Sequence, residues 1–415
     1  MQETSIRGNW IFSVALLMLM WGLVGLQRNA SSFLGPHIAA EFGLNLGGVG
    51  SIALAFAVAW GVGSLLAGRL ADRHGTKPML LIFGAITAVL GWVSGLAATI
   101  AIFIAVRTAL GLAEGGVLSP IMNAARRTAP APARARVVSL MFISFIVLGM
   151  VVAPPLLDGI ANSYGWRTGF FIAAGPMLAV VLLLLIFFRE PALEQGAGGA
   201  NEDGGERAPL LSILQTRNVW ISALMSICSM GRVFTFMVFG LFLLGSDVAN
   251  GGYFMLEGPV IPLTVSIALL ADGLGGFAFT WIADRTGHRR KVVMYAFLLA
   301  MVFGLIFARL PAQAPYALLL ASIVGFMFCG GAVSPLAVGV IPAEAVSPRN
   351  AVTATGTANA IGEILGAGFT TYAVGAIAVT AGLHSTMLVP VGLMLVGALL
   401  AWALDDIRAH RPAPG

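Results

Sequence analysis

Charged residues are scarce in this chain. They make up only 10% of its 415 residues, whereas hydrophobic residues make up 58%. A soluble domain carries roughly 25% charged residues, so this chain has too few of them to cover a water-exposed surface. The scarcity therefore excludes a soluble globular protein and indicates one that crosses a membrane several times.

Cysteine is nearly absent, and so are the patterns that carry enzyme chemistry. The two cysteines, Cys228 and Cys329, lie inside apolar segments, which predicts packed thiols rather than a disulfide or a metal pair. The sequence has no His/Cys cluster at ligand spacing, no nucleophile triad, no Gly-x-Gly-x-x-Gly run and no phosphate-binding loop. We therefore expect no metal site, no cofactor, no use of ATP and no enzymatic activity.

Apolar segments of membrane-spanning length fill most of the chain. A helix needs about 20 mostly apolar residues to cross a bilayer. Twelve segments meet this condition, near 10–35, 47–70, 78–98, 100–122, 137–160, 168–188, 218–244, 258–281, 291–310, 315–340, 350–378 and 386–404. The sequence thus predicts an all-α membrane protein with a six-helix bundle at 1–189, a polar, Gly-rich cytoplasmic linker at 190–216 and a second six-helix bundle at 217–415.

Positive charge is distributed unevenly over the ends of these segments. With a cytoplasmic N-terminus, the inner side receives all but five of the 23 Lys and Arg residues. The exceptions are Arg167 and Arg309 at outer ends and Arg28, Arg107 and Arg232 within spans. This bias predicts a multi-pass protein of the cell inner membrane with both termini in the cytoplasm. It also explains the net charge of +5 without a nucleic-acid partner.

One polar stretch occurs in both halves of the chain. Residues 68–78 read Gly-Arg-Leu-Ala-Asp-Arg-His-Gly-Thr-Lys-Pro, and residues 284–291 read Asp-Arg-Thr-Gly-His-Arg-Arg-Lys. Each copy contains Asp-Arg-x-Gly-x followed by basic residues, and each lies between two apolar segments. A pattern repeated at corresponding positions of two halves is expected of a transporter built from structural repeats.

The first copy resembles the loop 2–3 signature of the major facilitator superfamily, and the second resembles its loop 8–9 counterpart. This resemblance implies secondary transport, in which two six-helix halves rock around a midplane site. It also implies a gating role for the signature residues, which are Gly68, Asp72, Arg73, Gly75, Lys77, Asp284, Arg285 and Gly287. The alternative is that the two stretches fix only the topology and a turn.

Span four carries a narrower resemblance. Residues 107–115 read Arg-Thr-Ala-Leu-Gly-Leu-Ala-Glu-Gly, similar to the Arg-x-x-x-Gly-x-x-Glu-Gly pattern of the anion:cation symporter group. That group carries organic anions such as sugar acids. Residues 27–29, Gln-Arg-Asn, resemble its Asp-Arg pair with Gln27 in place of the acid, and the group's Trp-Phe-Pro stretch after span four is absent. The resemblance implies an organic anion moved together with protons or sodium.

Ionisable side chains within the spans are candidate functional residues, because each costs at least a few kcal/mol to insert. Arg107 and Glu114 are seven residues apart, so they lie on nearly the same side of one helix, about 10.5 Å apart. We expect Arg107 to bind a carboxylate through its planar fork, or else to pair with an acid on another helix. Glu114 is the first candidate for the proton carrier, and a permanent ion pair is its alternative.

Four further charged residues stand within the predicted spans. Arg28 either binds the anion or extends to the membrane surface. Arg232 and Asp272 are predicted to form a structural charge pair, and Asp272 is also a lesser candidate for proton coupling. Glu363 is the second candidate proton carrier. The polar candidates for substrate contact are Gln27, Asn29 and Asn359, and Asn359 is expected on the same helix face as Glu363. Aromatic side chains are expected mostly at the lipid or the interface.

Together these features predict a secondary active transporter that moves a small carboxylate across the inner membrane by alternating access.

 The sequence predicts proton-coupled symport of a small organic anion by a monomer in the lipid bilayer, and it does not fix the direction of transport. One alternative is a proton-coupled exporter of drugs or metabolites, although span five lacks the Gly-Pro-x-x-Gly-Gly of drug antiporters. The other is a non-transporting sensor on the same fold. Three arginines within the spans favour an anionic substrate.

Overall fold

The computed structural model describes residues 10–190, 213, 215–247, 251–347 and 350–405. Within them, the side chains of 67–69, 71–74, 135 and 352 are not described. The chain divides into two compact units, 1–202 and 203–415, and the division falls inside the predicted linker. In the described part, twelve helices are long and apolar enough to cross a membrane, which confirms the predicted all-α membrane fold.

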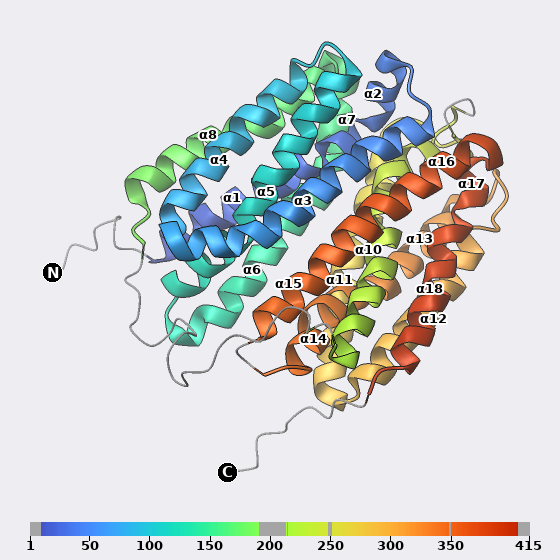
Figure 1. Ribbon diagram of the computed structural model, residues 1–415. Helices are drawn as coiled ribbons and strands as arrows, with labels where there is room; N and C mark the ends of the chain where they lie inside the picture. Colours follow the sequence, from blue (N-terminus) through green and yellow to red (C-terminus); the bar gives the residue numbers. More distant parts are fainter. Residues whose placement is uncertain (1–9, 191–212, 214, 248–250, 348–349, 406–415) are drawn as a thin grey trace. The chain divides into compact units, whose positions relative to one another are not determined.

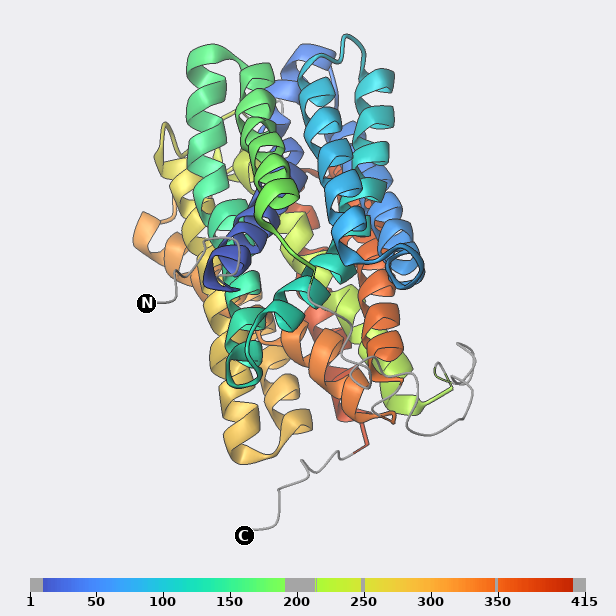
Figure 2. The same ribbon diagram turned by 90° about the vertical axis from the view of Figure 1, so that its left-hand side faces the viewer.

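The first unit contains six of these spans, and its fifth span is interrupted. Its helices are α1 (Trp10–Phe33), α2 (Gly35–Phe42), α3 (Leu46–His74), α4 (Thr76–Gly95), α5 (Ile100–Thr128), α6 (Arg134–Ile146), the π-helix η3 (Val147–Val152), α7 (Ala153–Tyr164) and α8 (Trp166–Phe187). α3 packs along α5, and α1 packs against α5, α6, η3 and α8. Figures 1 and 2 both show α1 beside α6 and α8.

The second unit is arranged around α10, the most buried of its spans. Its helices are α10 (Arg217–Leu244), α11 (Val260–Thr286), α12 (Arg289–Phe307), α13 (Tyr316–Gly331), the π-helix η5 (Ser334–Val340), α14 (Ile341–Glu344), α15 (Ala351–Ile361), the π-helix η6 (Gly362–Thr370), α16 (Thr371–Ala381), α17 (Leu383–Thr386) and α18 (Leu388–Trp402). α10 packs against η5, η6, α15 and α18.

The π-helical segments were not expected from the sequence. In span five, Pro154 and Pro155 lie in the first turn of α7, just after η3, and Pro335 lies within η5. Proline has no backbone N–H and so removes a donor from the preceding turn, which favours a local change of helix geometry. The segment η6 has no proline but contains three glycines. The short helix α2 after span one was also not expected.

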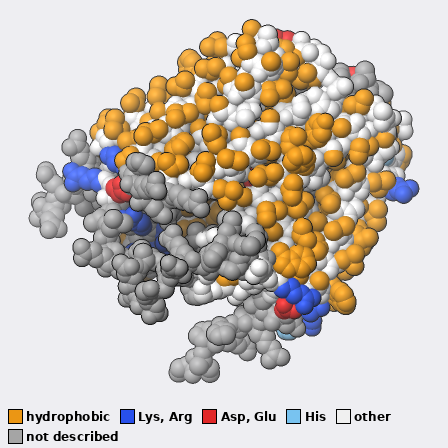
Figure 3. Space-filling view, viewed as in Figure 1, with side chains coloured by type: hydrophobic (Ala, Val, Ile, Leu, Met, Phe, Trp, Pro, Cys, Tyr) orange, Lys and Arg blue, Asp and Glu red, His pale blue; other side chains and the backbone are white. Residues whose placement is uncertain are grey.

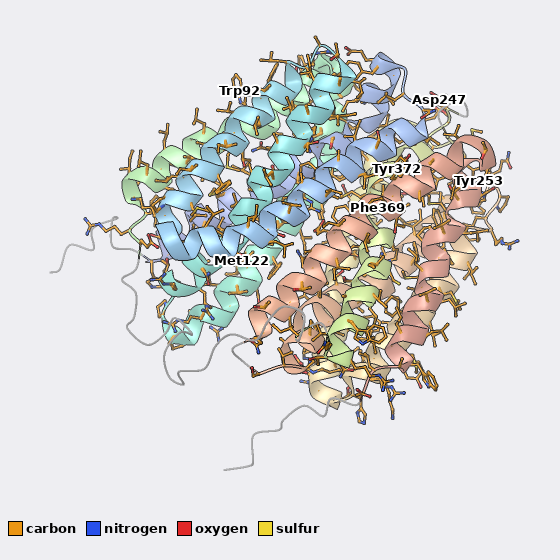
Figure 4. All side chains as sticks on the ribbon, viewed as in Figure 1. Trp92, Met122, Asp247, Tyr253, Phe369 and Tyr372 are labelled. Carbon is orange, nitrogen blue, oxygen red and sulfur yellow. The ribbon has the colours of Figure 1, made fainter. Side chains whose placement is uncertain are left out.

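Large hydrophobic side chains cover the outside of the spans. Figure 3 shows them over most of the visible face of the helices. Trp92 on α4, labelled in Figure 4, is one such residue and is 49% exposed. Because apolar side chains on the outside of a water-soluble protein would be costly, this surface fits a lipid environment.

Candidate functional site

Arg107 on α5 ties that helix to α1. Its side chain is fully buried, and its Nη1 and Nη2 donate to the carbonyl oxygen of Gln27 at 3.1 and 3.2 Å. Nη2 also donates to the carbonyl oxygen of Arg28 at 2.8 Å and to Ser31 Oγ at 3.1 Å. Among the described residues, these contacts of Arg107 include no acid on another helix. The guanidinium therefore holds the backbone of α1 in place, in addition to any contact with a substrate.

Arg28 lies against an aromatic wall on α3. Its guanidinium carbon is 3.9 Å from the ring centroid of Trp60 and 5.8 Å from that of Phe56. Arg107 lies over the same Phe56 ring at 4.8 Å. Cation–π contacts of this kind stabilise a desolvated guanidinium and fix its plane. The two arginines therefore border one common surface, which concentrates positive charge inside the first unit.

Glu114 is buried in the same region. Its side chain has no exposed surface, and neither carboxylate oxygen has a hydrogen-bond partner among the described residues. Arg107 and Arg28 both act on it electrostatically. Burying an ionised carboxylate without hydrogen bonds is costly. The site therefore joins two cations to an acid whose protonation state is sensitive to its surroundings.

The close approach of α3 to α5 builds this region. A methyl group on Gly111 would lie 2.6 Å from the carbonyl oxygen of Phe56, and one on Gly115 would collide with the carbonyl oxygen of Trp60. Small residues at these positions let the two helix backbones touch. The aromatic side chains of α3 thus reach the charged residues of α1 and α5.

The three neighbouring residues of the predicted Gln-Arg-Asn contact set point in different directions. The Gln27 amide lies against Gly91 of α4, and neither of its polar atoms has a partner in the described structure. The Asn29 Nδ2 donates to the carbonyl oxygen of Gly149 in η3 at 2.9 Å. Only Arg28 faces the aromatic wall of α3. The structure therefore does not gather these three side chains into one contact surface.

In the second unit, Arg232 and Asp272 form an ion pair between α10 and α11. Arg232 is fully buried, and its Nη1 also contacts Met327 Sδ at 2.9 Å. Its guanidinium occupies the space beside Gly330, where a methyl group would collide with it. This geometry is that of a structural pair, and a part for Asp272 in proton coupling remains a prediction.

Asn359 lies in an α-helix, whereas Glu363 lies in a π-helix. Asn359 belongs to α15, whereas Glu363 is buried in the first turn of η6. The expectation that they share a face assumed α-helical spacing. A π-helix has i→i+5 hydrogen bonds and a different spacing, so that argument does not hold here.

The first signature stretch joins the ends of α4 and α8. The side chains of Gly68, Asp72 and Arg73 lie outside those described. Gly75 precedes α4 with a φ of +83°. The N–H groups of Thr76 and Lys77 donate to the Glu190 carboxylate at 2.7 and 3.2 Å.

The Lys77 side chain contacts the end of α8 from the start of α4. Its Nζ donates to the carbonyl oxygens of Leu185 at 3.0 Å and Phe188 at 2.6 Å, at the end of α8. An acid thus caps the start of α4, while a base caps the end of α8, as the helix dipoles favour. Sequence reasoning missed Glu190, because nothing in its neighbourhood indicates a partner more than 100 residues away.

The second stretch joins three helix ends. Arg289 pairs with Asp284 at 3.0 Å and with Glu344 at 2.7 Å, which links α12 to α11 and α14. Gly287 ends α11 with a φ of +69°, and Arg285 lies over the ring of Trp281 at 4.1 Å. Sequence reasoning also missed Glu344, because nothing in its neighbourhood indicates a partner on α12.

A further cluster lies at the predicted outer end of the first unit. Glu41 of α2 accepts hydrogen bonds from Trp166 Nε1 at 2.7 Å and from Arg167 Nη1 at 2.5 Å. The Arg167 hydrogen bond, and then that of Trp166, holds the pKa of the Glu41 carboxyl below its ordinary value. Arg167 also donates to the carbonyl oxygen of Ala97. This cluster fastens α2 to α8.

A sequence model described as Major Facilitator Superfamily matches residues 11–364. The chain belongs to this superfamily. Its members are transporters, so it is not an enzyme. The twelve spans and the two signature stretches are those expected of the superfamily, and the protein is a multi-pass membrane protein.

Three similar proteins illustrate the relationship. A probable sulfoacetate transporter of Cupriavidus necator is 24% identical over 67% of this chain and 66% of its own length. A probable galactarate/D-glucarate transporter of Escherichia coli is 26% identical over 96% of this chain and 94% of its own. A solved bacterial homologue of the lysosomal transporter Spinster has a TM-score of 0.74 at 17% identity, covering 94% of this chain and 96% of that one.

Proposed function

We propose that this protein moves a small organic anion across the cell inner membrane together with protons. The observation that carries the proposal is the buried cluster of Arg28, Arg107 and Glu114. Two buried cations are costly within a membrane, and so is an acid whose oxygens have no hydrogen-bond partner among the described residues. Such groups mark substrate and proton pathways. The relatives named for sulfoacetate and for galactarate/D-glucarate support an acidic substrate.

Arg28 and Arg107 have different roles in this proposal. Arg28 presents its guanidinium beside the ring of Trp60, and the planar fork of an arginine suits bidentate recognition of a carboxylate. Arg107 fixes the backbone that carries Arg28 and adds positive charge. The substrate carboxylate would meet the field of both groups.

Glu114 is the proposed proton carrier. An anion bound at the arginines weakens their attraction for an ionised Glu114, so substrate binding favours proton uptake by this acid. Thermodynamic linkage makes the effect reciprocal, which is what symport needs. Glu363 and Asp272 remain second candidates in the other unit. If the coupling ion were sodium instead of the proton, the Glu114→Gln variant would remain active in sodium-driven uptake.

The two signature stretches are the proposed gate. Their described contacts, Lys77 with the end of α8 and Arg289 with Asp284 and Glu344, join helix ends that the charge distribution places in the cytoplasm. Contacts of this kind can form in one state and break in another. Gly75, Asp284, Arg285 and Gly287 belong to this gate, and a monomer is sufficient for it.

The test measures ligand binding to the purified protein in detergent. The measured quantity is the change in the protein's melting temperature when a ligand is added. The probes are glucarate, sulfoacetate, glucose and a cationic drug such as ethidium. A ligand that binds the folded state raises the melting temperature by mass action. We expect a rise with the acids in the native protein and none in Arg28→Ala, while Arg309→Ala, which removes an exposed arginine, keeps it. A rise only with ethidium would replace this proposal with the exporter alternative.

A further inference from the structure

Trp21 on α1 carries a buried polar atom without a partner. The residue is 3% exposed, and its indole Nε1 has no hydrogen-bond partner in the described part of the chain. Buried indole N–H groups usually donate a hydrogen bond, and leaving one unpaired costs free energy. This N–H is therefore available to a hydrogen-bond acceptor that approaches it in another state of the protein.

The helix geometry places Trp21 at the level of Glu114. The first and fourth spans run in opposite directions, and Arg107 on α5 bonds the carbonyl oxygen of Arg28 on α1. Trp21 precedes Arg28 by seven residues, and Glu114 follows Arg107 by seven. Seven residues are nearly two turns and about 10.5 Å on either helix. The two groups are thus displaced from the same contact by the same distance in the same direction.

Trp60 connects the two groups from the side of α3. Its ring centroid is 6.4 Å from that of Trp21, and its carbonyl oxygen abuts Gly115, the residue after Glu114. The same ring lies 3.9 Å from the Arg28 guanidinium carbon. Trp21 and the residue that follows Glu114 therefore both border Trp60.

We propose that the Trp21 indole N–H donates a hydrogen bond to the Glu114 carboxylate when this acid is ionised. Trp21 is thereby a positioning residue that links the protonation state of Glu114 to α1, the helix that carries Arg28. The proposal rests on the proposed role of Glu114 as proton carrier. A donor-only group favours the ionised acid over the neutral one.

Few charged side chains surround Glu114 in the described structure. Arg28 on α1 and Arg107 on α5 itself both act on it. The neighbouring spans add no further charge within their described apolar parts. Residues 46–66 of α3, 78–95 of α4 and 137–152 of α6 and η3 include no ionisable side chain. A change in the titration of Glu114 on replacing Trp21 can therefore be assigned to the indole rather than to another charge.

The experiment follows the C=O stretch of the protonated carboxylic acid by infrared spectroscopy as proteoliposomes of the full chain are titrated with pH. Glu114→Gln identifies the band, because it removes it. Trp21→Phe keeps an aromatic ring and removes the N–H. We expect its titration midpoint to move to higher pH by about one to two units, the size of a hydrogen bond to a charged group. Trp92→Phe, at an exposed tryptophan, should leave the midpoint unchanged.

The outcomes separate the two proposals. If native protein shows no band that Glu114→Gln removes, the proton-carrier role fails. If the band titrates but Trp21→Phe leaves its midpoint unchanged, only the role of Trp21 fails. Should Trp21→Phe not fold, protein labelled with indole-¹⁵N tryptophan gives the answer: an N–H band that changes with the carboxyl midpoint, and is constant in Glu114→Gln, supports the hydrogen bond, and a constant band in native protein overturns it.

Discussion

The pair of Arg232 and Asp272 gives a prediction whose size follows from the structure. Asp272→Ala leaves a fully buried guanidinium without its counter-charge. Removing one partner of a buried pair typically destabilises a protein by about 3–5 kcal/mol. Two contacts of Arg232 remain: Met327 Sδ is a weak acceptor, and the Phe326 ring centroid lies 5.6 Å from the guanidinium carbon. Neither replaces a carboxylate. We therefore expect the free energy of unfolding to fall by an amount in this range.

The double variant Arg232→Met with Asp272→Leu removes both charges and keeps side-chain volume. Replacing a buried ion pair by apolar groups is often neutral, so we expect its stability to lie within about 1 kcal/mol of the native protein. The assay is reversible unfolding in mixed micelles by denaturant, with Arg309→Ala as the control for loss of an exposed arginine. Equal stability of Asp272→Ala and native protein would refute the reasoning, as would a double variant no more stable than the single one.

Three further predictions follow from other contacts. Glu114→Gln should abolish proton-driven accumulation of glucarate in proteoliposomes yet retain exchange, and loss of both would leave only a structural role. Glu190→Ala removes the acceptor for the first N–H groups of α4 and should lower stability by about 1 kcal/mol in the same unfolding assay; an unchanged value would contradict the cap. Because the pKa of Glu41 lies below the ordinary carboxyl value of 4.5, its bonds to Arg167 contribute stability above that value, and the contribution is lost as pH falls through the lowered pKa. The melting temperature should therefore fall on acidification below about pH 4.5 less steeply in Glu41→Gln than in the native protein, and equal slopes would count against it.

Much of the fold was predictable because it depends on local composition. Apolar length gave the twelve spans, and the bounds agree with the structure to within a few residues at most ends. The π-helices were not predictable from hydropathy, since they depend on which backbone donors are lost at Pro154 and Pro335 and on packing against a neighbouring helix.

The candidate site was predictable only in part. Charges inside apolar segments identified Arg28, Arg107 and Glu114, because such charges are expensive wherever they occur. The direction of each side chain was not predictable: Arg107 proved to hold the backbone of α1. The aromatic wall of Trp60 was also missed, because aromatic residues were expected at the lipid, and only the approach of α3 to α5 shows that this one faces inward.

The way Arg107 holds α1 has an evolutionary consequence. Its hydrogen bonds go to the carbonyl oxygens of Gln27 and Arg28, which every amino acid possesses. Substitution of either side chain therefore leaves the tie between the helices intact. Side chains at positions 27 and 28 can therefore be exchanged to suit a different cargo, while the frame that presents them keeps the same hydrogen bonds.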